Sequence, residues 1–252
     1  IEIHGGVSGV LRFDDIVIKP VTDVAEAAWE QAAFSALAPP ADVRWPRPVA
    51  TTNGQWVVDG WIAAEFVPGL VPVRLDWAVV IEIGARFHAA TTSLEPPATM
   101  LRARTHRWAR GERHAFDEEP VPLTGEPAEL DTELQSRCEP ETSDRRFVHV
   151  DLGGNVFVDG DGTPVVLDVA PGWRTTMYAN AVVVADALLW SGADTEIIDL
   201  LGPPETASPQ LARALRFRLA TEYVEPRPSS FDHRRALAAY RRVLELMSNR
   251  NQ

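Results

Sequence analysis

Residues 149–168 constrain the fold of this chain more than any other stretch of its sequence. Short runs of Val, Phe and Leu alternate there with a loop and with a turn of two Asp-Gly pairs, which predicts a strand, a loop and a β-hairpin. Asp151 and Asn155 open and close the loop, and Asp168 follows the last strand of the hairpin. Because the turn folds this strand back beside Asn155, we expect Asn155 and Asp168 to meet at one end of the hairpin.

The polar side chains at that end would suit phosphoryl transfer. Asn and Asp supply the oxygen ligands that Mg²⁺ prefers, and Mg²⁺ completes its shell with phosphate oxygens and water. Asp151 would then lie within reach of a substrate hydroxyl. Transfer of a phosphoryl group needs such a carboxylate, metal ligands and a cation near the phosphates, because positioning and charge neutralisation do most of the catalysis.

The first 67 residues predict a small unit that is rich in strands. Glycine and aspartate pairs interrupt its β-branched runs, a pattern typical of hairpins, and Asn53-Gly54 is a strong hairpin turn. One helix is expected from Asp23 to Leu37, because Asp23 and Glu26 have the spacing of a capping box and two prolines end the helix. We expect strands over residues 1–4, 10–13, 16–18, 55–58 and 61–66 and near residue 49.

The remainder of the chain predicts a mostly helical region that begins at Pro68-Gly69. Its expected strands are those of the central segment, at residues 147–148, 156–158 and 165–167. We expect helices over residues 75–92, 104–116, 128–137, 181–190, 195–201, 210–223 and 232–247. Strands followed by helices predict an α+β fold, with an N-lobe of residues 1–67 and a C-lobe of residues 68–252.

Charge, hydropathy and cysteine content exclude several classes of protein. The chain has 24 basic and 36 acidic residues, a net charge of −12, whereas nucleic-acid-binding proteins carry a basic face, so we expect no nucleic-acid partner. The acidic balance is compatible with a cationic small substrate, although solubility alone explains it better. No run approaches the ~20 apolar residues of a membrane span, so we expect no membrane partner. Cys138 is the one cysteine, which excludes an internal disulfide and suits a reducing cytoplasm.

Lysine is almost absent from the chain, although basic residues are common. Of the 24 basic residues, Lys19 is the one lysine and the other 23 are arginines. Rich use of Ala, Arg, Gly and Pro indicates a high-GC bacterial genome, in which arginine replaces lysine. A compact ammonium differs physically from a planar guanidinium, so we infer that position 19 requires the ammonium. Survival of one surface lysine by chance is the alternative.

Taken together, His149-Val-Asp151, Asn155 and Asp168 resemble the motif of the aminoglycoside phosphotransferase (APH) family, which has choline-kinase-like and protein-kinase-like relatives. The resemblance implies a two-lobed protein-kinase-like fold and a small-molecule kinase that uses ATP or GTP with Mg²⁺. It implies that Asp151 is the catalytic base and that Asn155 and Asp168 bind the metal. The implied acceptor is a hydroxyl group of an aminoglycoside-like or sugar-like molecule.

The resemblance covers nearly the whole chain, including the expected nucleotide site. Lys19 ends a run that resembles the strand whose lysine contacts the phosphates, and Glu30 resembles the helix glutamate that pairs with that lysine. Glu65 and Val67 lie in a segment that resembles the hinge under the adenine. Gly6 lies in a glycine-rich run that resembles the loop covering the nucleotide. An actinobacterial branch of the family also carries a Trp-Arg pair after its metal aspartate, as this chain does at residues 173–174.

The chain departs from the family pattern near its catalytic segment. Three residues separate Asp151 from Asn155 where the family usually has four, Val150 replaces a glycine, and no glycine stands two residues after Asp168. The shorter loop could displace Asn155 from the metal. An inactive or weakly active kinase-like domain that binds a nucleotide or a partner is therefore the alternative. A third possibility is a fold relic with an empty cleft, which a Lys19 far from Asp168 would favour.

Other residues carry two interpretations each. We expect His149 to hold its loop by hydrogen bonds rather than to transfer protons. Glu26 lies one turn before Glu30 and is the alternative partner of Lys19. The pair at 173–174 either faces the substrate cleft or packs within the fold. The acids at 117–119 either line a site for a cationic acceptor or form a solvated loop, which is the favoured interpretation.

Overall fold

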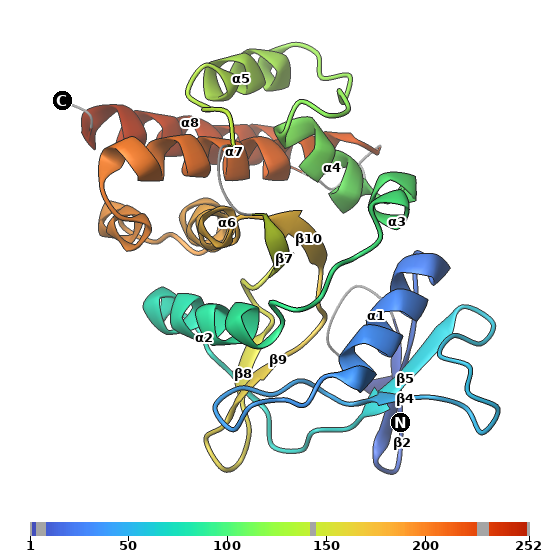
Figure 1. Cartoon of the computed structure of the whole chain (residues 1–252). Helices are drawn as coiled ribbons and strands as arrows, with labels where there is room; N and C mark the ends of the chain where they lie inside the picture. The colour runs from blue at the N-terminus through green and yellow to red at the C-terminus, as the bar shows by residue number, and fades with distance from the viewer. Residues whose placement is uncertain (1, 4–8, 142–144, 226–231, 251–252) are drawn as a thin grey trace.

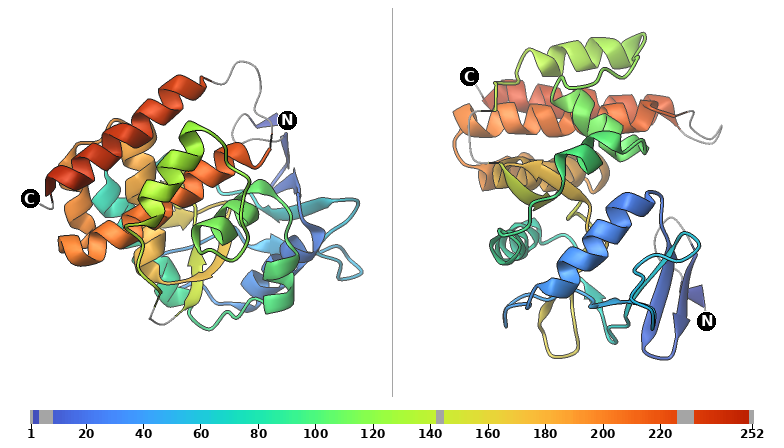
Figure 2. Two further views of the ribbon diagram at one scale, coloured as in Figure 1. Left: turned by 90° about the horizontal axis from the view of Figure 1, so that it is seen from above. Right: turned by 45° about the vertical axis from the view of Figure 1, so that its right-hand side comes forward.

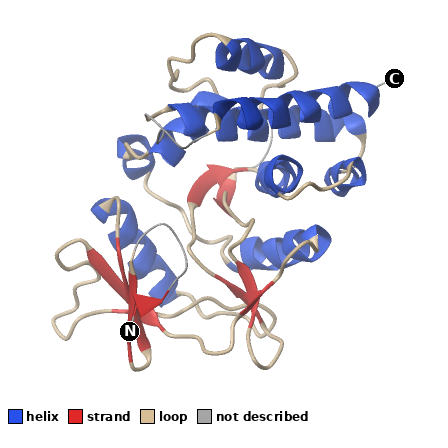
Figure 3. Ribbon diagram, turned by 180° about the vertical axis from the view of Figure 1, so that it is seen from behind, coloured by secondary structure: helices blue, strands red, loops and turns tan. Residues whose placement is uncertain are grey.

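The computed structural model describes residues 2–3, 9–141, 145–225 and 232–250 of the chain. Strands gather in the N-terminal region and helices in the C-terminal region, as Figure 3 shows by colour. The expected α+β class is therefore confirmed. The division of the chain into lobes after residue 67 stays a prediction.

The N-terminal region is built on one antiparallel sheet with the strand order β1-β2-β3-β5-β4. Its strands are β1 (Glu2–Ile3), β2 (Val10–Phe13), β3 (Ile16–Pro20), β4 (Pro48–Val49) and β5 (Trp61–Glu65). In the central pair, Lys19 of β3 lies opposite Ile62 of β5. Lys19 is thereby held in the middle of a sheet, on a strand with neighbours on both sides.

One helix, α1 (Val24–Ala36), lies against this sheet and faces the C-terminal region (Figure 1). Its N-cap is Asp23, whose Oδ1 accepts the Glu26 amide at 3.0 Å, so the expected cap is confirmed. In a capping box the Glu26 carboxylate would accept the Asp23 amide, but here it pairs with Arg104. Glu26 and Glu30 therefore face the cleft from successive turns of one helix.

The strand expected at residues 55–58 is wrong. The turn at Asn53-Gly54 closes a small loop in which the Thr51 amide bonds the Gln55 carbonyl at 2.9 Å. Beyond it, only Val58 forms a β-bridge, to Trp61. The partner of β4 is β5 instead, with Val49 opposite Ala63. The Asn53-Gly54 turn therefore forms only a local loop. The strand that pairs with β4 is β5, which is longer and more buried than residues 55–58.

Two small antiparallel sheets carry the central segment. One contains β6 (Val71–Pro72), β8 (Val156–Val158) and β9 (Pro164–Val166), and the other pairs β7 (Arg146–His149) with β10 (Pro171–Arg174). The expected hairpin is β8–β9. The sequence did not predict β10, because its Pro171 and Gly172 are poor strand formers. Gly172 is required where it lies, since a Cβ there would come within 2.6 Å of the Val150 side chain.

Helices form the rest of the chain. They are α2 (Trp77–Ala90), α3 (Ala98–Ala103), α4 (Arg107–Ala115), α5 (Glu126–Gln135), α6 (Thr176–Trp190), the 3₁₀ segment η1 (Thr195–Leu201), α7 (Pro204–Tyr223) and α8 (His233–Arg250). The short α3 was not expected, and α6 and α7 begin five and six residues earlier than expected. In the two further views of Figure 2, α7 and α8 run alongside one another above the central strands.

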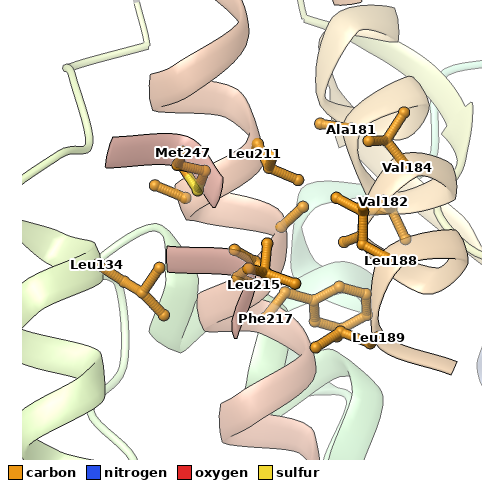
Figure 4. Packing of buried hydrophobic residues seen from close by; sticks show 14 of the residues in the cluster. Leu134, Ala181, Val182, Val184, Leu188, Leu189, Leu211, Leu215, Phe217 and Met247 are labelled. Carbon is orange, nitrogen blue, oxygen red and sulfur yellow. The ribbon is translucent and has the colours of Figure 1, made fainter. Parts of the chain in front are cut away.

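The larger hydrophobic core lies among α5, α6, α7 and α8 (Figure 4). Almost every residue of α6 from Tyr178 to Leu189 is buried, so this helix is enclosed on all sides and is the centre of the C-terminal region. A second cluster joins Phe34 of α1 to Phe87 of α2 and Phe147 of β7, with ring centroids 5.9–6.0 Å from Phe34. This aromatic cluster fixes α1 against the strand that leads into the central segment. Among the described residues, no helix has the length and apolar character to cross a bilayer.

Candidate active site

A buried histidine ties together the two loops of the central segment. His149 ends β7 and is fully buried, and its Nδ1 accepts the Asp151 amide at 3.1 Å. Its Nε2 lies 3.2 Å from the Leu167 carbonyl oxygen, next to Asp168. Burial lowers the pKa of His149, although Asp151 and Asp168 oppose the shift. The neutral ring therefore donates from Nε2 and accepts at Nδ1, which supports the expected structural role of His149.

Asn155 lies beside Asp151, at the end of the shortened loop. The Asn155 Nδ2 donates to the Asp151 carbonyl oxygen at 2.7 Å, and it lies 3.5 Å from the Asp151 Oδ2. The Leu167 amide bonds the Asn155 carbonyl at 2.9 Å, so the backbone of Asn155 is next to the start of the Asp168 segment. Three intervening residues are therefore enough to bring the Asn155 side chain against Asp151, while the backbone of Asn155 makes the contact with the segment of Asp168.

Lys19 crosses from the N-terminal sheet to the central segment. Its Nζ lies 2.5 Å from the Asp168 Oδ1, although the two residues are 149 positions apart. Burial opposes the charge of Lys19, but Asp168 and Glu30 outweigh it and raise the pKa of the amine. Asp168 has φ = 45°, a left-handed conformation that is uncommon outside glycine and that turns its carboxylate toward the cleft. This contact argues against the fold relic, for which Lys19 would lie far from Asp168.

The two glutamates of α1 have different environments. Glu26 pairs with Arg104 at 2.8 Å and lies 3.6 Å from the His106 Nε2. Burial opposes its charge, but His106 and Arg104 outweigh burial and lower the pKa of Glu26. Burial raises the pKa of Glu30 to about 8, with repulsion from Glu26 and Asp168 in the same direction and attraction from Lys19 against it. Glu30 is thus the α1 carboxyl whose pKa responds to the charge of Lys19, and it favours the neutral form, while the ion-pair partner of Lys19 is Asp168.

A cavity of about 280 Å³ adjoins these groups. Its walls come from β3, the start of α1, the start of α4 and the segment after β9. Lys19, Asp151 and Asp168 line it, and so do Glu26, Glu30, His106, Trp108, Arg104 and Glu112. The cavity therefore places an ammonium, two aspartates and an aromatic side chain around one space.

Asp151 has a partner that the sequence did not indicate. The Arg218 Nη2 donates to the Asp151 Oδ1 at 2.6 Å, and Arg218 also makes two bonds of 2.6–2.7 Å to Asp186. Arg218 lies on α7 and Asp186 on α6, and each is less than a tenth exposed. Arg218 is one of 23 arginines and lies 67 residues from Asp151, so no local pattern could identify it.

The remaining expected nucleotide residues lie outside this cluster. The Glu65 carboxylate, at the end of β5, pairs with Arg44 at 2.8 Å and accepts the Arg47 amide at 3.3 Å. The Val67 side chain is buried. Neither lines the cavity, so a hinge role would have to use their backbone. Gly6 lies outside the described residues.

The other candidates for a substrate site are engaged in structural contacts. Arg174 is buried, binds Glu112 at 2.9 Å and Glu118 at 2.8 Å, and covers the Phe116 ring. Its neighbour Trp173 packs against the aromatic cluster of the core. Among the acids at 117–119, Asp117 pairs with Arg216, and Glu119 with Arg113 and Arg110. The contacts of residues 173–174 argue against a role in the cleft. The acids at 117–119 are ion-paired but remain largely exposed, which agrees with the favoured interpretation of a solvated loop.

The donor set of the central segment fits Mg²⁺. The Asp168 carboxylate is 57% exposed on the cleft side, and the Asn155 Nδ2 is committed to Asp151, which leaves the amide oxygen as the donor for a cation. The described residues contain no cluster of three or more His, Cys, Asp or Glu side chains suited to a metal. Two oxygen ligands are sufficient for Mg²⁺ when a nucleotide supplies phosphate oxygens.

Comparison with known proteins agrees with this geometry. The model of the phosphotransferase enzyme family, APH, matches residues 5–177. No curated protein sequence gives a significant match. An amicoumacin kinase solved with AMP-PNP, Ca²⁺ and Ami has a TM-score of 0.63 at 12% identity, over 99% of this chain and 88% of that one.

Two further solved structures show the same fold. The choline kinase LicA from Streptococcus pneumoniae has a TM-score of 0.52 at 11% identity, over 98% of this chain and 92% of that one. The GDP and kanamycin complex of APH(2″)-IIIa has a TM-score of 0.56 at 15% identity, over 99% of this chain and 93% of that one. With the family model matching more than two thirds of its length and a kinase-like fold throughout, the chain belongs to the phosphotransferase enzyme family.

Proposed function

We propose that this protein is a small-molecule kinase that transfers the terminal phosphoryl group of ATP or GTP to a substrate hydroxyl, with Mg²⁺. The observation that carries the proposal is the convergence of Lys19, Asp168 and Asp151 on one cavity. A cation, a metal ligand and a carboxylate in one place are what phosphoryl transfer requires. The one cysteine of the chain and its acidic charge are compatible with work in the cytoplasm.

In the proposed reaction, Asp151 orients the acceptor hydroxyl and takes its proton as the oxygen attacks the terminal phosphorus. The bond from that phosphorus to the bridging oxygen breaks, and the nucleoside diphosphate leaves. Asn155 and Asp168 would hold Mg²⁺, which neutralises charge on the phosphates when it is bound. Lys19 would leave Asp168 for the phosphates, since its ammonium carries three donors and can turn between them.

The volume and the charge of the cavity limit which acceptor molecules can bind. A volume of about 280 Å³ lies at the low end for ligand sites and suits one sugar ring more readily than a full aminoglycoside. Acidic groups outnumber basic ones on its walls, so an acceptor with amino groups would be favoured electrostatically. We therefore propose an acceptor of the sugar-like or amino-sugar type.

The substitution Asp151→Asn tests the proposed base. We expect turnover to fall by about 10²–10⁴-fold, the range for general acid–base catalysis, because an amide cannot accept the proton. The affinity for Mg²⁺ and nucleotide should stay within about threefold, since Asp151 is not an expected metal ligand. Phosphoryl transfer to a panel of sugars and amino sugars and nucleotide binding by calorimetry are the two measurements.

The matched control is Asp161→Asn, in the exposed turn between β8 and β9. It should leave both quantities unchanged. Unaltered turnover in Asp151→Asn would rule out the base assignment, whereas loss of nucleotide binding would indicate that Asp151 belongs to the nucleotide site.

Nucleotide or partner binding without turnover is the second candidate. The observation in its favour is Arg218, which donates to the Asp151 Oδ1 at 2.6 Å and so occupies one of the two oxygens that could meet an acceptor hydroxyl. Transfer of phosphate to any acceptor, abolished by Asp168→Ala, would eliminate this candidate.

A further inference from the structure

A chain of charged contacts runs from the interior of the helical region to the catalytic segment. Asp186 of α6 holds Arg218 of α7 with both carboxylate oxygens, at 2.7 Å to Nε and 2.6 Å to Nη2. The same Nη2 reaches out to the Asp151 Oδ1 at 2.6 Å. The side chains of Asp186 and Arg218 are 8% and 4% exposed, whereas that of Asp151 is 36% exposed at the cavity. The buried pair therefore presents one guanidinium N–H to the catalytic segment.

The packing around Arg218 leaves it little freedom. Its guanidinium lies 4.8 Å from the Phe217 ring and 5.4 Å from the Trp190 ring. The bidentate bond to Asp186 fixes the plane of the guanidinium, which a lysine could not reproduce. Because the ion pair is buried, loss of either partner would leave an uncompensated charge in the interior. Arg218 is thus held more rigidly than the loop that it contacts.

The shortened loop rests on the same pair. A Cβ at Gly153 would lie 3.0 Å from the Asp186 Oδ2, so the loop backbone passes close over the Asp186 carboxylate. Gly153 is one of the three residues between Asp151 and Asn155. The Asp186 carboxylate therefore lies directly against the backbone of the three-residue loop.

We propose that Arg218, anchored by Asp186, is the positioning residue that fixes the Asp151 carboxylate for phosphoryl transfer. The inference rests on the proposed function, because it assigns a role within that site. Arg218 occupies Oδ1, so Oδ2 is the oxygen left to meet the acceptor hydroxyl, next to the Asn155 Nδ2 at 3.5 Å. A charge-assisted bond to one oxygen restricts rotation of the carboxylate, and correct orientation of a reacting group is a large part of catalysis.

If Arg218 positions Asp151, its removal must lower kcat. If Arg218 only stabilises the fold, a variant that still folds must keep kcat. Burying an ion pair contributes little net stability, and two apolar residues of similar size often replace it without loss of the fold. The double substitution Arg218→Met with Asp186→Leu therefore removes the positioning contact while it avoids an unpaired buried charge. The control is the matching change at another buried pair, Arg216→Met with Asp131→Leu, on the far side of α7 from Asp151.

We expect the Arg218/Asp186 double variant to unfold within a few degrees of the parent and to lose kcat by about 10–100-fold, the scale for a group misplaced by about 1 Å. KM for the nucleotide should change less than threefold. The Arg216/Asp131 control should retain kcat. In an Asp151→Asn background, removal of Arg218 should cause no further loss of kcat, because a positioning residue acts only through the group that it positions. Retained kcat in the Arg218/Asp186 variant, or a further loss in the Asp151→Asn background, would overturn the inference.

A second measurement needs no turnover and separates this inference from the proposed function. A double-mutant cycle of Arg218→Met and Asp151→Asn, read by chemical unfolding, reports whether the two side chains interact. A coupling that exceeds the measurement error supports the contact even if no acceptor is phosphorylated. Additive effects would overturn the inference, whatever the activity of the parent protein.

Discussion

At the scale of single residues, the sequence predicted the groups that lie close together along the chain. Asp151, Asn155 and Asp168 follow one another across a loop and a hairpin, so their meeting could be inferred from strand geometry alone. Lys19 was distinguished by its chemistry, as the one ammonium among guanidinium groups. Arg218 and Asp186 could not be found in this way, because contacts between helices far apart in sequence leave no local pattern.

Glu30 provides a pH-dependent prediction at this scale. Its pKa of about 8 in the folded protein exceeds its usual value of 4.5, so the folded state retains a proton that the unfolded state loses between those values. The contribution of Glu30 to stability therefore falls as pH rises from about 4.5 to 8. We expect Glu30→Gln to unfold at a higher temperature than the parent at pH 8, with a difference that shrinks toward pH 5. A difference that is constant over this range would contradict the prediction.

Glu26→Gln is the natural control, one turn earlier on the same helix. The pKa of Glu26 is lowered in the folded protein, so its carboxylate adds stability above its unfolded value and loses it on acidification. The variant should unfold at a lower temperature than the parent at neutral pH, and the deficit should shrink toward pH 4. The two variants are thus expected to differ in sign in the same assay.

At the scale of elements, the sequence predicted most helices and the strands of the catalytic segment, and it failed where local signals conflict with tertiary pairing. The turn at Asn53-Gly54 is a good hairpin turn, yet β4 pairs with β5 across a longer connection. Conversely, β10 has a sequence unsuited to a strand and forms one because β7 offers it a partner. Pairing partners are set by the whole sheet, so propensity alone could not decide these two cases.

The packing of α4 on α7 depends on one glycine. A Cβ at Gly111 would lie 2.2 Å from the Thr221 Oγ1 and 2.9 Å from the Thr221 backbone nitrogen. Because backbone cannot move aside as a side chain can, we expect Gly111→Ala to destabilise the protein by about 1–3 kcal/mol. Thermal unfolding should show a fall in Tm of roughly 3–10 °C. Gly160→Ala, where the added Cβ meets nothing within 4 Å, should have little effect; equal Tm values for the two variants would refute the packing argument.

At the scale of the whole molecule, ion pairs connect the N-terminal region to the rest of the chain. The Lys19–Asp168 ion pair and the Arg104–Glu26 ion pair both connect residues far apart in the chain. The family resemblance predicted the fold class. It also predicted that Lys19 contacts phosphates and pairs with Glu30, whereas the ion pair in the structure joins Lys19 to Asp168. The size of the cavity and the identity of its walls depend on how the two regions meet, which no pattern in either region specifies.

Stabilisation by nucleotide is the prediction that belongs to this scale. With Mg²⁺ present, ATP or GTP at about 100 times its Kd should add about 2.7 kcal/mol to the unfolding free energy. This corresponds to a rise in Tm of roughly 5–10 °C for a chain of this size. Asp168→Ala should remove the Mg²⁺-dependent part of the rise, and Asp161→Ala, in the exposed hairpin turn, should preserve it. No rise with either nucleotide would count against a nucleotide site in the cleft.

The arginine that holds Asp151 has a consequence for how relatives of this protein are recognised. The match to the family model covers residues 5–177 of this chain, so it ends before Asp186 and before Arg218. The match that assigns this chain to the family therefore includes neither residue, and it does not report how Asp151 is held. Comparisons of this site between proteins should therefore include α7. A fragment that ends at residue 177 would contain Asp151 but neither Asp186 nor Arg218.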